Sequence, residues 1–323
     1  MGESTFRRLL PAIGLFFLAP FVSEYLLGDF ALTKLGYVVI LGPLYGGGAL
    51  LIREVVRRSG KGWPTILMLA FAYAVLEEAF TTQTLFNPNY LKLNLHLLDP
   101  AYIPALGIGG WWTIFVLTLH TVWSISTSIA LVEACVPGRA STPWLGGIGL
   151  TVDSLVFALA VIASTRFQMK NDPFLASKTQ FVVSGVVVVV AAAAAFLLPA
   201  RPGGIDPAPA PSPWLGGAIG LIAGSLFLVV PRAWAWGAVA IYLALDLIVI
   251  VAVTAMSRRS GWGGRHRLGL AGGAALAYGW HAFLQTPVDG TTGLTIRASN
   301  AVCLLIVLAL IGFAARRQQS HAA

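Results

Sequence analysis

The chain has 323 residues, of which 57% are hydrophobic and only 11% are charged. This composition leaves too little polar surface to cover a water-soluble globule, so it excludes soluble proteins and indicates an integral membrane protein. The formal net charge of +8 comes from Lys and Arg residues scattered at the ends of apolar runs. Because these cations form no basic face and the sequence has no nucleotide-binding loop, we expect neither a nucleic-acid partner nor a cofactor.

The apolar runs predict an all-α polytopic bundle of about ten transmembrane helices, since about 20 apolar residues cross a bilayer core about 30 Å thick. The predicted spans are residues 9–27, 37–52, 63–82, 111–135, 145–163, 181–198, 215–230, 233–256, 268–284 and 299–313. A tight turn predicted in "VVPRAWAWG", residues 229–237, decides the orientation of every later span.

The distribution of cations predicts that both termini are cytoplasmic. With the N-terminus inside, the cytoplasmic segments hold 14 Lys and Arg residues and the outer segments hold 7. This two-to-one excess follows the positive-inside rule. We therefore expect a multi-pass protein of a bacterial plasma membrane, surrounded by the lipid bilayer, and we find no sequence signal for an oligomeric state.

A Pro-rich connector, "RPGGIDPAPAPSP" at residues 201–213, predicts a division of the chain into two groups of helices. Its composition favours an extended backbone. The predicted N-terminal bundle covers residues 1–200 with about six helices, and the C-terminal group covers residues 214–323 with about four. The longest connection, residues 83–110, is expected on the outer side, either along the membrane interface or as a lid.

Two segments resemble each other, namely "TPWLGGIGLTVDSLVF" at residues 142–157 and "SPWLGGAIGLIAGSLF" at residues 212–227. Both would begin a span on the cytoplasmic side. Trp144 and Trp214 are therefore expected at the level of the lipid headgroups, where indole rings prefer to sit. The likeness arises either from duplication of a two-helix unit, as in transport folds, or from residue types that recur at membrane boundaries.

Ionisable side chains inside a bilayer are costly, so they face a partner, the bundle interior or a wet cavity. The candidates are Glu24, Glu77, Glu78, His120, Asp153, Asp246 and His281. From the helical rise, the adjacent glutamates lie about 8 Å, His281 about 10 Å and His120 about 13 Å below the outer face. The sequence thus predicts one polar layer, with Glu24 as a further contributor. Because adjacent helical residues point about 100° apart, we expect only one of the two glutamates to face the site.

Such a layer permits three kinds of chemistry. A carboxylate in an apolar pocket can act as a general base for water while a histidine holds that water or an oxyanion. The same groups can relay protons in a transporter. Carboxylates and histidines can also bind a divalent metal, although no ligand spacing such as HExxH is present, and the sequence leaves the metal question open. In the alternative without chemistry, each residue only makes an interhelical hydrogen bond.

The order of these residues resembles the CPBP (CAAX protease and bacteriocin-processing) family of glutamate intramembrane proteases. The motifs of that family are EExxxR, FxxxH and Hxxx(N/D). Glu77 and Glu78 match the glutamate pair, and His120 with Ser124 matches the last motif, with Ser in place of Asn or Asp. Thr82 stands at the arginine position, and no FxxxH segment follows. The resemblance covers about residues 60–135 and implies a metal-independent hydrolase.

Three functions from different classes follow from these patterns. The first is a CPBP-like hydrolase for a membrane-embedded peptide or lipid-linked substrate, with Glu77 or Glu78 as general base and His120 and His281 assisting. The second is a proton-linked transporter or flippase, whose path is lined by Glu24, Ser124, Asp153 and Asp246. The third is a non-enzymatic membrane partner, in which the acids only fix helix contacts and their substitution changes stability without abolishing activity.

Overall fold

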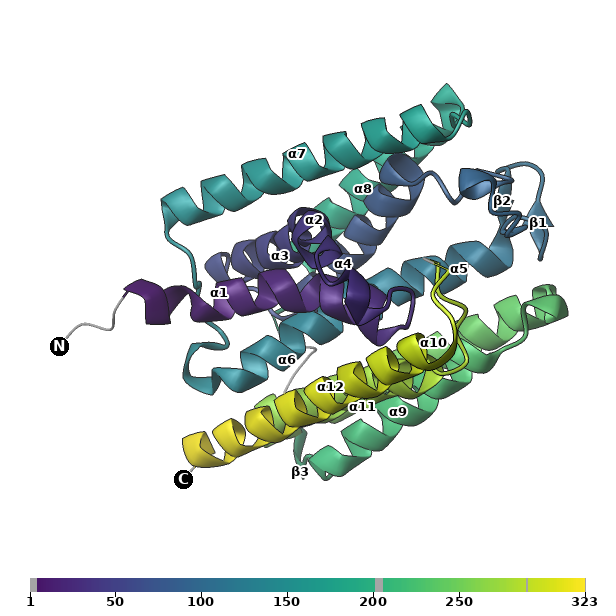
Figure 1. The fold of residues 1–323 in the computed structure, drawn as a ribbon. Coiled ribbons are helices and arrows are strands. Elements are labelled where there is room, and N and C mark those ends of the chain that lie inside the picture. Colours follow the sequence, from purple (N-terminus) through teal and green to yellow (C-terminus); the bar gives the residue numbers. More distant parts are fainter. Residues whose placement is uncertain (1–4, 201–205, 289, 323) are drawn as a thin grey trace.

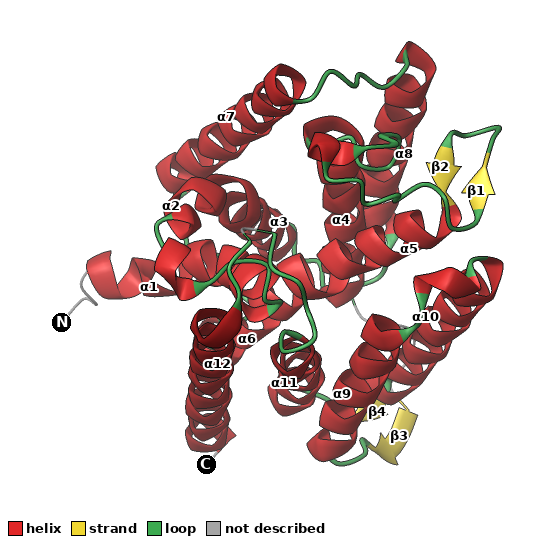
Figure 2. Ribbon diagram, turned by 45° about the vertical axis from the view of Figure 1, so that its right-hand side comes forward, coloured by secondary structure: helices red, strands yellow, loops and turns green. Residues whose placement is uncertain are grey.

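The structure is a computed structural model that describes residues 5–200, 206–288 and 290–322. The long helices run roughly along one common direction, and most connections gather at the two ends of the bundle (Figure 1). The few strands form two small two-stranded sheets at the periphery (Figure 2). The predicted all-α fold is therefore confirmed.

Ten helical segments in the described part of the chain match the ten predicted spans. The α-helices are α1 (Thr5–Pro20), α2 (Tyr37–Leu41), α3 (Gly47–Arg58), α4 (Trp63–Leu76), α5 (Gly110–Leu119), α6 (Ser128–Cys135), α7 (Gly147–Asn171), α8 (Lys178–Leu197), α9 (Pro213–Val229), α10 (Trp236–Ser257), α11 (Gly264–His281) and α12 (Gly293–Ala322). Four π-helical segments, Phe21–Leu26, Gly42–Gly46, Glu77–Thr81 and His120–Thr127, extend or join these helices. Short 3₁₀ helices cover Leu32–Lys34, Tyr90–Lys92, Pro137–Arg139 and Arg232–Trp234, and the strands are β1 (Tyr102–Ile103), β2 (Ile108–Gly109), β3 (Asp206–Pro209) and β4 (Arg259–Ser260).

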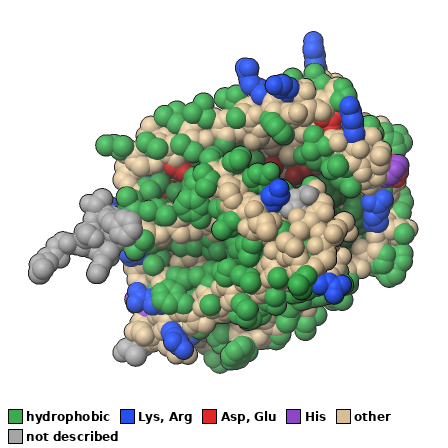
Figure 3. All heavy atoms as spheres, in the orientation of Figure 1, with side chains coloured by type: hydrophobic (Ala, Val, Ile, Leu, Met, Phe, Trp, Pro, Cys, Tyr) green, Lys and Arg blue, Asp and Glu red, His purple; other side chains and the backbone are tan. Residues whose placement is uncertain are grey.

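Eight described segments are long and apolar enough to cross a membrane. They are Arg8–Leu26, Tyr37–Arg58, Trp63–Thr81, Gly110–Cys135, Gly147–Asn171, Lys178–Leu197, Trp236–Ser257 and Gly293–His321. The other two predicted spans fall on α9, which has only 17 residues, and on α11, whose first turn contains Arg265 and Arg267. Much of the surface is apolar, with Lys and Arg mainly near the margins of the visible face (Figure 3). This surface suits a lipid environment.

Helices α9 and α11 pack most closely, through small residues spaced four apart. Gly216, Gly220 and Gly224 of α9 face α11, where Gly269 and Gly273 face α9. A Cβ atom at Gly220 would lie 2.2 Å from the carbonyl oxygen of Leu270, so only glycine permits this approach. Without a hydrophobic driving force between helices in lipid, such close backbone contact is a main source of association.

The apolar core continues across the predicted division at residues 201–213. Trp123 stacks on Tyr278 with ring centroids 4.7 Å apart, and its indole N–H donates a 2.8 Å hydrogen bond to the carbonyl oxygen of Ala274. Of the Pro-rich connector, residues 201–205 lie outside the described residues, while β3 is extended as predicted and pairs in parallel with β4. The two-group division itself stays a prediction. The predicted turn at 229–237 is confirmed, because a 3₁₀ helix separates α9 from α10.

A buried ionic network joins α3 and α6 near one end of the bundle. The Arg53 guanidinium is fully buried, contacts Glu54 at 2.6 Å and Glu133 at 3.2 Å, and lies 3.5 Å from the centre of the Trp144 ring. Arg57 adds a 2.7 Å ion pair to Glu133. Glu54 also accepts a 2.8 Å hydrogen bond from the backbone N–H of Trp144. These contacts hold α3 against the segment that precedes α7.

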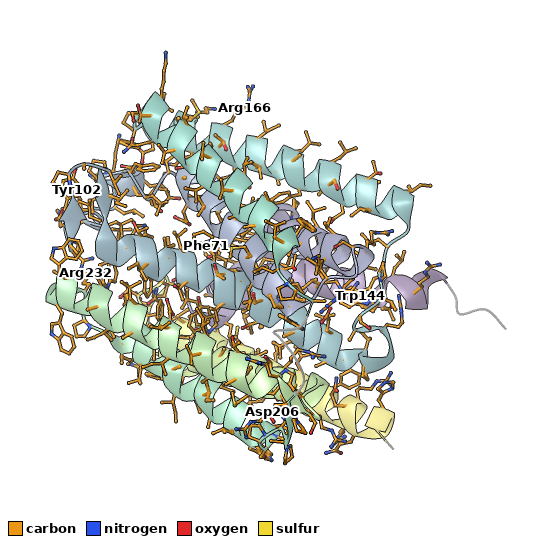
Figure 4. The ribbon with its side chains drawn as sticks, turned by 180° about the vertical axis from the view of Figure 1, so that it is seen from behind. Phe71, Tyr102, Trp144, Arg166, Asp206 and Arg232 are labelled. Carbon is orange, nitrogen blue, oxygen red and sulfur yellow. The ribbon has the colours of Figure 1, made fainter. Side chains whose placement is uncertain are left out.

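The two resembling segments differ in the structure, and the prediction that both tryptophans lie at the headgroup level stays a prediction. Trp144 is completely buried, whereas Trp214 is 86% exposed. The first segment stays non-helical until Gly147 because Glu54 holds the backbone at Trp144, whereas α9 begins already at Pro213. Figure 4 shows Trp144 toward the end of the bundle opposite Tyr102 and Arg232.

The long connection at residues 83–110 is anchored to the link between α7 and α8. The carboxylate of Asp172 accepts 2.7 Å hydrogen bonds from the Leu91 backbone and the Asn87 side chain, and a 3.0 Å bond from the Phe174 backbone. Burial raises the pKa of Asp172, but these hydrogen bonds outweigh burial and hold the pKa below its usual value. The connection is therefore an anchored loop, and its role along the membrane interface or as a lid stays a prediction.

Candidate functional site

Four helices become π-helical in segments that contribute to one polar cluster. Glu24 lies in Phe21–Leu26, Tyr45 in Gly42–Gly46, the adjacent glutamates in Glu77–Thr81, and His120 in His120–Thr127. π-Helical turns are rare and occur frequently at functional sites. Their convergence on a set of ionisable side chains makes this part of the bundle the candidate functional site.

The centre of the cluster is the imidazole of His120, which lies between Glu77 and Glu78. Its Nε2 is 2.9 Å from Glu78 Oε1, and its Nδ1 is 3.3 Å from Glu77 Oε2. All three side chains are buried, with exposures of 2% for Glu77, 4% for Glu78 and 5% for His120. Charges this far from water are stable only when paired.

The expectation that only one of the two glutamates faces the site is wrong. It assumed regular α-helical geometry, in which neighbouring residues diverge by about 100°. The backbone at Glu77 and Glu78 is π-helical instead, and both long side chains reach the same imidazole. The predicted polar layer of glutamates and His120 therefore exists as a contact cluster.

Hydroxyl groups fix Glu78 and His120 in this arrangement. Thr82 donates a 3.2 Å hydrogen bond to Glu78 Oε2, and the Thr84 hydroxyl donates to the same oxygen. The indole N–H of Trp112 donates at 3.0 Å to Thr84. Ser124, four residues after His120, lies 3.1 Å from His120 Nδ1. Thr82, at the motif arginine position, thus still contacts the glutamate pair.

Glu77 has a different environment from Glu78. The Tyr45 hydroxyl interacts with the carboxylates of both Glu24 and Glu77, and the Tyr45 ring stacks against His120 with centroids 6.0 Å apart. The Tyr73 hydroxyl lies beside Glu77 but completes no hydrogen bond. Glu77 Oε2 is buried and completes no hydrogen bond, and it lies 3.3 Å from His120 Nδ1. This oxygen of Glu77 is therefore less fully hydrogen-bonded than the two carboxylate oxygens of Glu78.

The long connection that follows α4 also reaches the cluster. Gln83 adopts a left-handed backbone conformation with φ of 58° and is held by a 2.8 Å hydrogen bond from the Ala176 backbone. This turn brings Thr84 onto Glu78. Farther along, burial and the negative charges of Glu78, Glu24 and Glu77 raise the pKa of Tyr90. Tyr90 and Glu24 are partly exposed, so the cluster approaches the surface beside them.

Three predicted residues lie outside this cluster. His281, the last residue of α11, contacts the Leu228 carbonyl and the Trp280 ring. Asp246 of α10 accepts a 3.1 Å hydrogen bond from Thr118. Asp153 of α7 is buried, and its Oδ2 has no hydrogen-bond partner. Helices α7 and α10 lie on opposite sides of the bundle in Figures 1 and 2.

Sequence reasoning missed Tyr45, Tyr73, Thr84 and Trp112. Tyr45 stands in the glycine-rich stretch "GPLYGGG", where a single hydroxyl inside an apolar span was a usable signal. Tyr73 also lies within a predicted span. Thr84 and Trp112 had no such signal, because their contact depends on how the loop after Thr82 turns back over the helices.

The fold and the cluster define a multi-pass helical membrane protein with a buried site of carboxylates and histidine. A family model described as an uncharacterized membrane protein family matches residues 14–322, and the chain belongs to that family. No curated protein and no solved structure matches the chain. The resemblance to the CPBP family stays a prediction based on Glu77, Glu78 and His120.

Proposed function

We propose that this protein is an intramembrane hydrolase that cleaves a membrane-embedded peptide or a lipid-linked substrate. The observation that supports this proposal is the buried imidazole of His120 in contact with both Glu77 and Glu78. A general base must lie within hydrogen-bond reach of the proton that it takes. A buried carboxylate is a stronger base toward a single bound water molecule because bulk water does not solvate it.

The contacts distinguish the two glutamates. Both oxygens of Glu78 are engaged, one by His120 and the other by Thr82 and Thr84. Glu77 Oε2 completes no hydrogen bond and lies 3.3 Å from His120 Nδ1. We therefore assign Glu77 as the base that takes a proton from water. Glu78 orients the His120 imidazole and stabilises its protonated form.

In the proposed reaction, the water oxygen attacks the substrate carbonyl carbon as Glu77 takes the water proton. The Tyr73 hydroxyl, which has no hydrogen-bond partner, is available to donate to the oxyanion that forms. Collapse of the tetrahedral intermediate breaks the bond to the leaving group. The leaving group then receives the proton that Glu77 or protonated His120 returns.

The proton-linked transporter is less well supported. It requires a path that includes Asp153 and Asp246, and the contacts of these residues connect them to neither each other nor the cluster in the described structure. We further propose a plasma-membrane location with both termini cytoplasmic, as the cation count predicts. Accessibility labelling of single cysteines introduced at Asp99 and Asp206 tests this orientation, since the two sites should be labelled from opposite sides.

Terminal proteomics and lipid analysis of membranes test the hydrolase proposal. Cells that lack the gene are complemented with the wild type, with Glu77→Gln, or with Asp99→Asn, which alters an exposed carboxylate 71% accessible to solvent. We expect cleavage products with the wild type and with Asp99→Asn, and their loss with Glu77→Gln at equal membrane abundance. Identical products from Glu77→Gln would contradict the assignment.

A further inference from the structure

We propose that Glu77, Glu78 and His120 bind a divalent transition-metal ion. One ligand atom from each residue can be chosen so that all three lie within 4.8 Å of one another, and all three side chains are buried. Ligands bonded to one ion at about 2.1 Å lie about 3.0–3.4 Å apart. The 2.9 Å between His120 Nε2 and Glu78 Oε1 is close to this range. Glu77 Oε2 lies 3.3 Å from the other ring nitrogen, Nδ1, so a three-ligand site on Nε2 requires the Glu77 carboxylate to turn toward Nε2.

A second observation points to a ligand. Glu77 is 2% exposed, yet its Oε2 completes no hydrogen bond and has a long 3.3 Å contact with His120 Nδ1. The neighbouring Tyr73 hydroxyl, on a side chain 4% exposed, completes no hydrogen bond either. Buried polar atoms in folded proteins are nearly always satisfied. A cation beside Glu77 Oε2 would satisfy the carboxylate, and a water molecule on that cation would reach the hydroxyl.

The charge of the cluster also favours a cation. An ion on His120 requires a neutral imidazole, and the two carboxylates then carry a formal charge of −2. Among the described residues, the ion-pair contacts of Glu77 and Glu78 are with His120 rather than with Lys or Arg. An ion of charge +2 neutralises the cluster. A site with one nitrogen and two carboxylate ligands suits Zn²⁺ or Mn²⁺ and lacks the thiolates that select softer ions.

Neighbouring hydroxyls provide the outer contacts that metal sites require. Ser124 lies 3.1 Å from His120 Nδ1 and can accept its proton, which leaves Nε2 free to bind an ion. Thr82 and Thr84 hold the second oxygen of Glu78. These partners fix the orientation of two of the three ligands before an ion arrives.

This inference concerns the site of the proposed hydrolase but rests on coordination geometry alone. An ion bound by Glu77 occupies the oxygen assigned as the general base. Ion binding and base catalysis by Glu77 are therefore alternative states of the site, and the bound ion would regulate hydrolysis by inhibiting it.

The test uses the full-length protein in lipid nanodiscs, stripped with a chelator and titrated with Zn²⁺ and Mn²⁺. We expect one bound ion per chain by elemental analysis. Glu77→Gln and His120→Ala should weaken binding more than about 100-fold, and Ser124→Ala about 10-fold, since outer partners typically contribute 10–100-fold. The control is His96→Gln, which removes the exposed His96–Asp99 pair, 3.0 Å apart, as an adventitious site.

X-ray absorption of the Zn²⁺-loaded wild type tests the ligands without any variant. One imidazole with oxygen ligands supports the proposal, and sulfur or oxygen-only ligation overturns it. Equal Zn²⁺ binding by the wild type and a folded Glu77→Gln/His120→Ala double variant also overturns it. Ion binding together with no cleavage by the ion-free protein would leave this inference standing and contradict the hydrolase, whereas cleavage by an ion-free protein that binds no added ion would do the opposite.

Discussion

The contact between α9 and α11 allows a quantitative test of what holds the bundle together. In Gly220→Ala, the new Cβ would lie 2.2 Å from the Leu270 carbonyl oxygen, against 3.4 Å where ordinary contact begins, a shortfall of about 1.2 Å. Because the obstacle is backbone, no side chain can rotate away, and the helices must separate. Overpacking of this kind typically costs about 1–3 kcal/mol.

The substitution also has a favourable component, since alanine is the better helix former by about 1 kcal/mol. Gly312→Ala on α12 isolates this component, because a Cβ there meets nothing within 4 Å. We therefore expect Gly220→Ala to be less stable than Gly312→Ala by about 1–3 kcal/mol. Tryptophan fluorescence during reversible unfolding by SDS in mixed micelles measures both free energies. Equal stability of the two variants would refute the claim that glycine is required at this contact.

Two further predictions concern the polar contacts that fix the ends of the bundle. Arg53→Met should lower the free energy of unfolding by about 3–5 kcal/mol, because it leaves buried carboxylates without their partner. The control Arg58→Met, at a side chain 33% exposed, should lower it by about 1 kcal/mol or less. Similar losses for the two variants in the same SDS assay would contradict this reasoning. Asp172 has a folded pKa below its unfolded value, so its stabilisation is complete above about pH 4 and is lost as pH falls through the folded pKa. Thermal unfolding of the wild type and Asp172→Ala should therefore differ at pH 7 and converge near pH 2; a difference that does not shrink in acid would show that the contribution of Asp172 is not electrostatic.

The site could be predicted from the sequence only in part. Glu77, Glu78 and His120 stand out because a charge in an apolar span is expensive, and their counted depths agree with the observed cluster. The same reasoning placed His281 in this layer, although its contacts are with Leu228 and Trp280. Depth along a helix can be counted from the sequence, but the direction in which a side chain points around the bundle cannot.

Hydrophobicity along the chain determined the membrane class, the helical fold and the ten segments, because backbone groups in lipid must be satisfied within helices. Tertiary structure decided which features came together. It buried Trp144 under Arg53 while leaving its counterpart Trp214 exposed, and it turned Thr84 back onto Glu78. The π-helical turns that bring both glutamates to His120 also belong to the packed bundle. Local residue patterns specify the length and polarity of a helix, whereas rotation, backbone irregularity and partner choice depend on contacts between residues distant in the sequence.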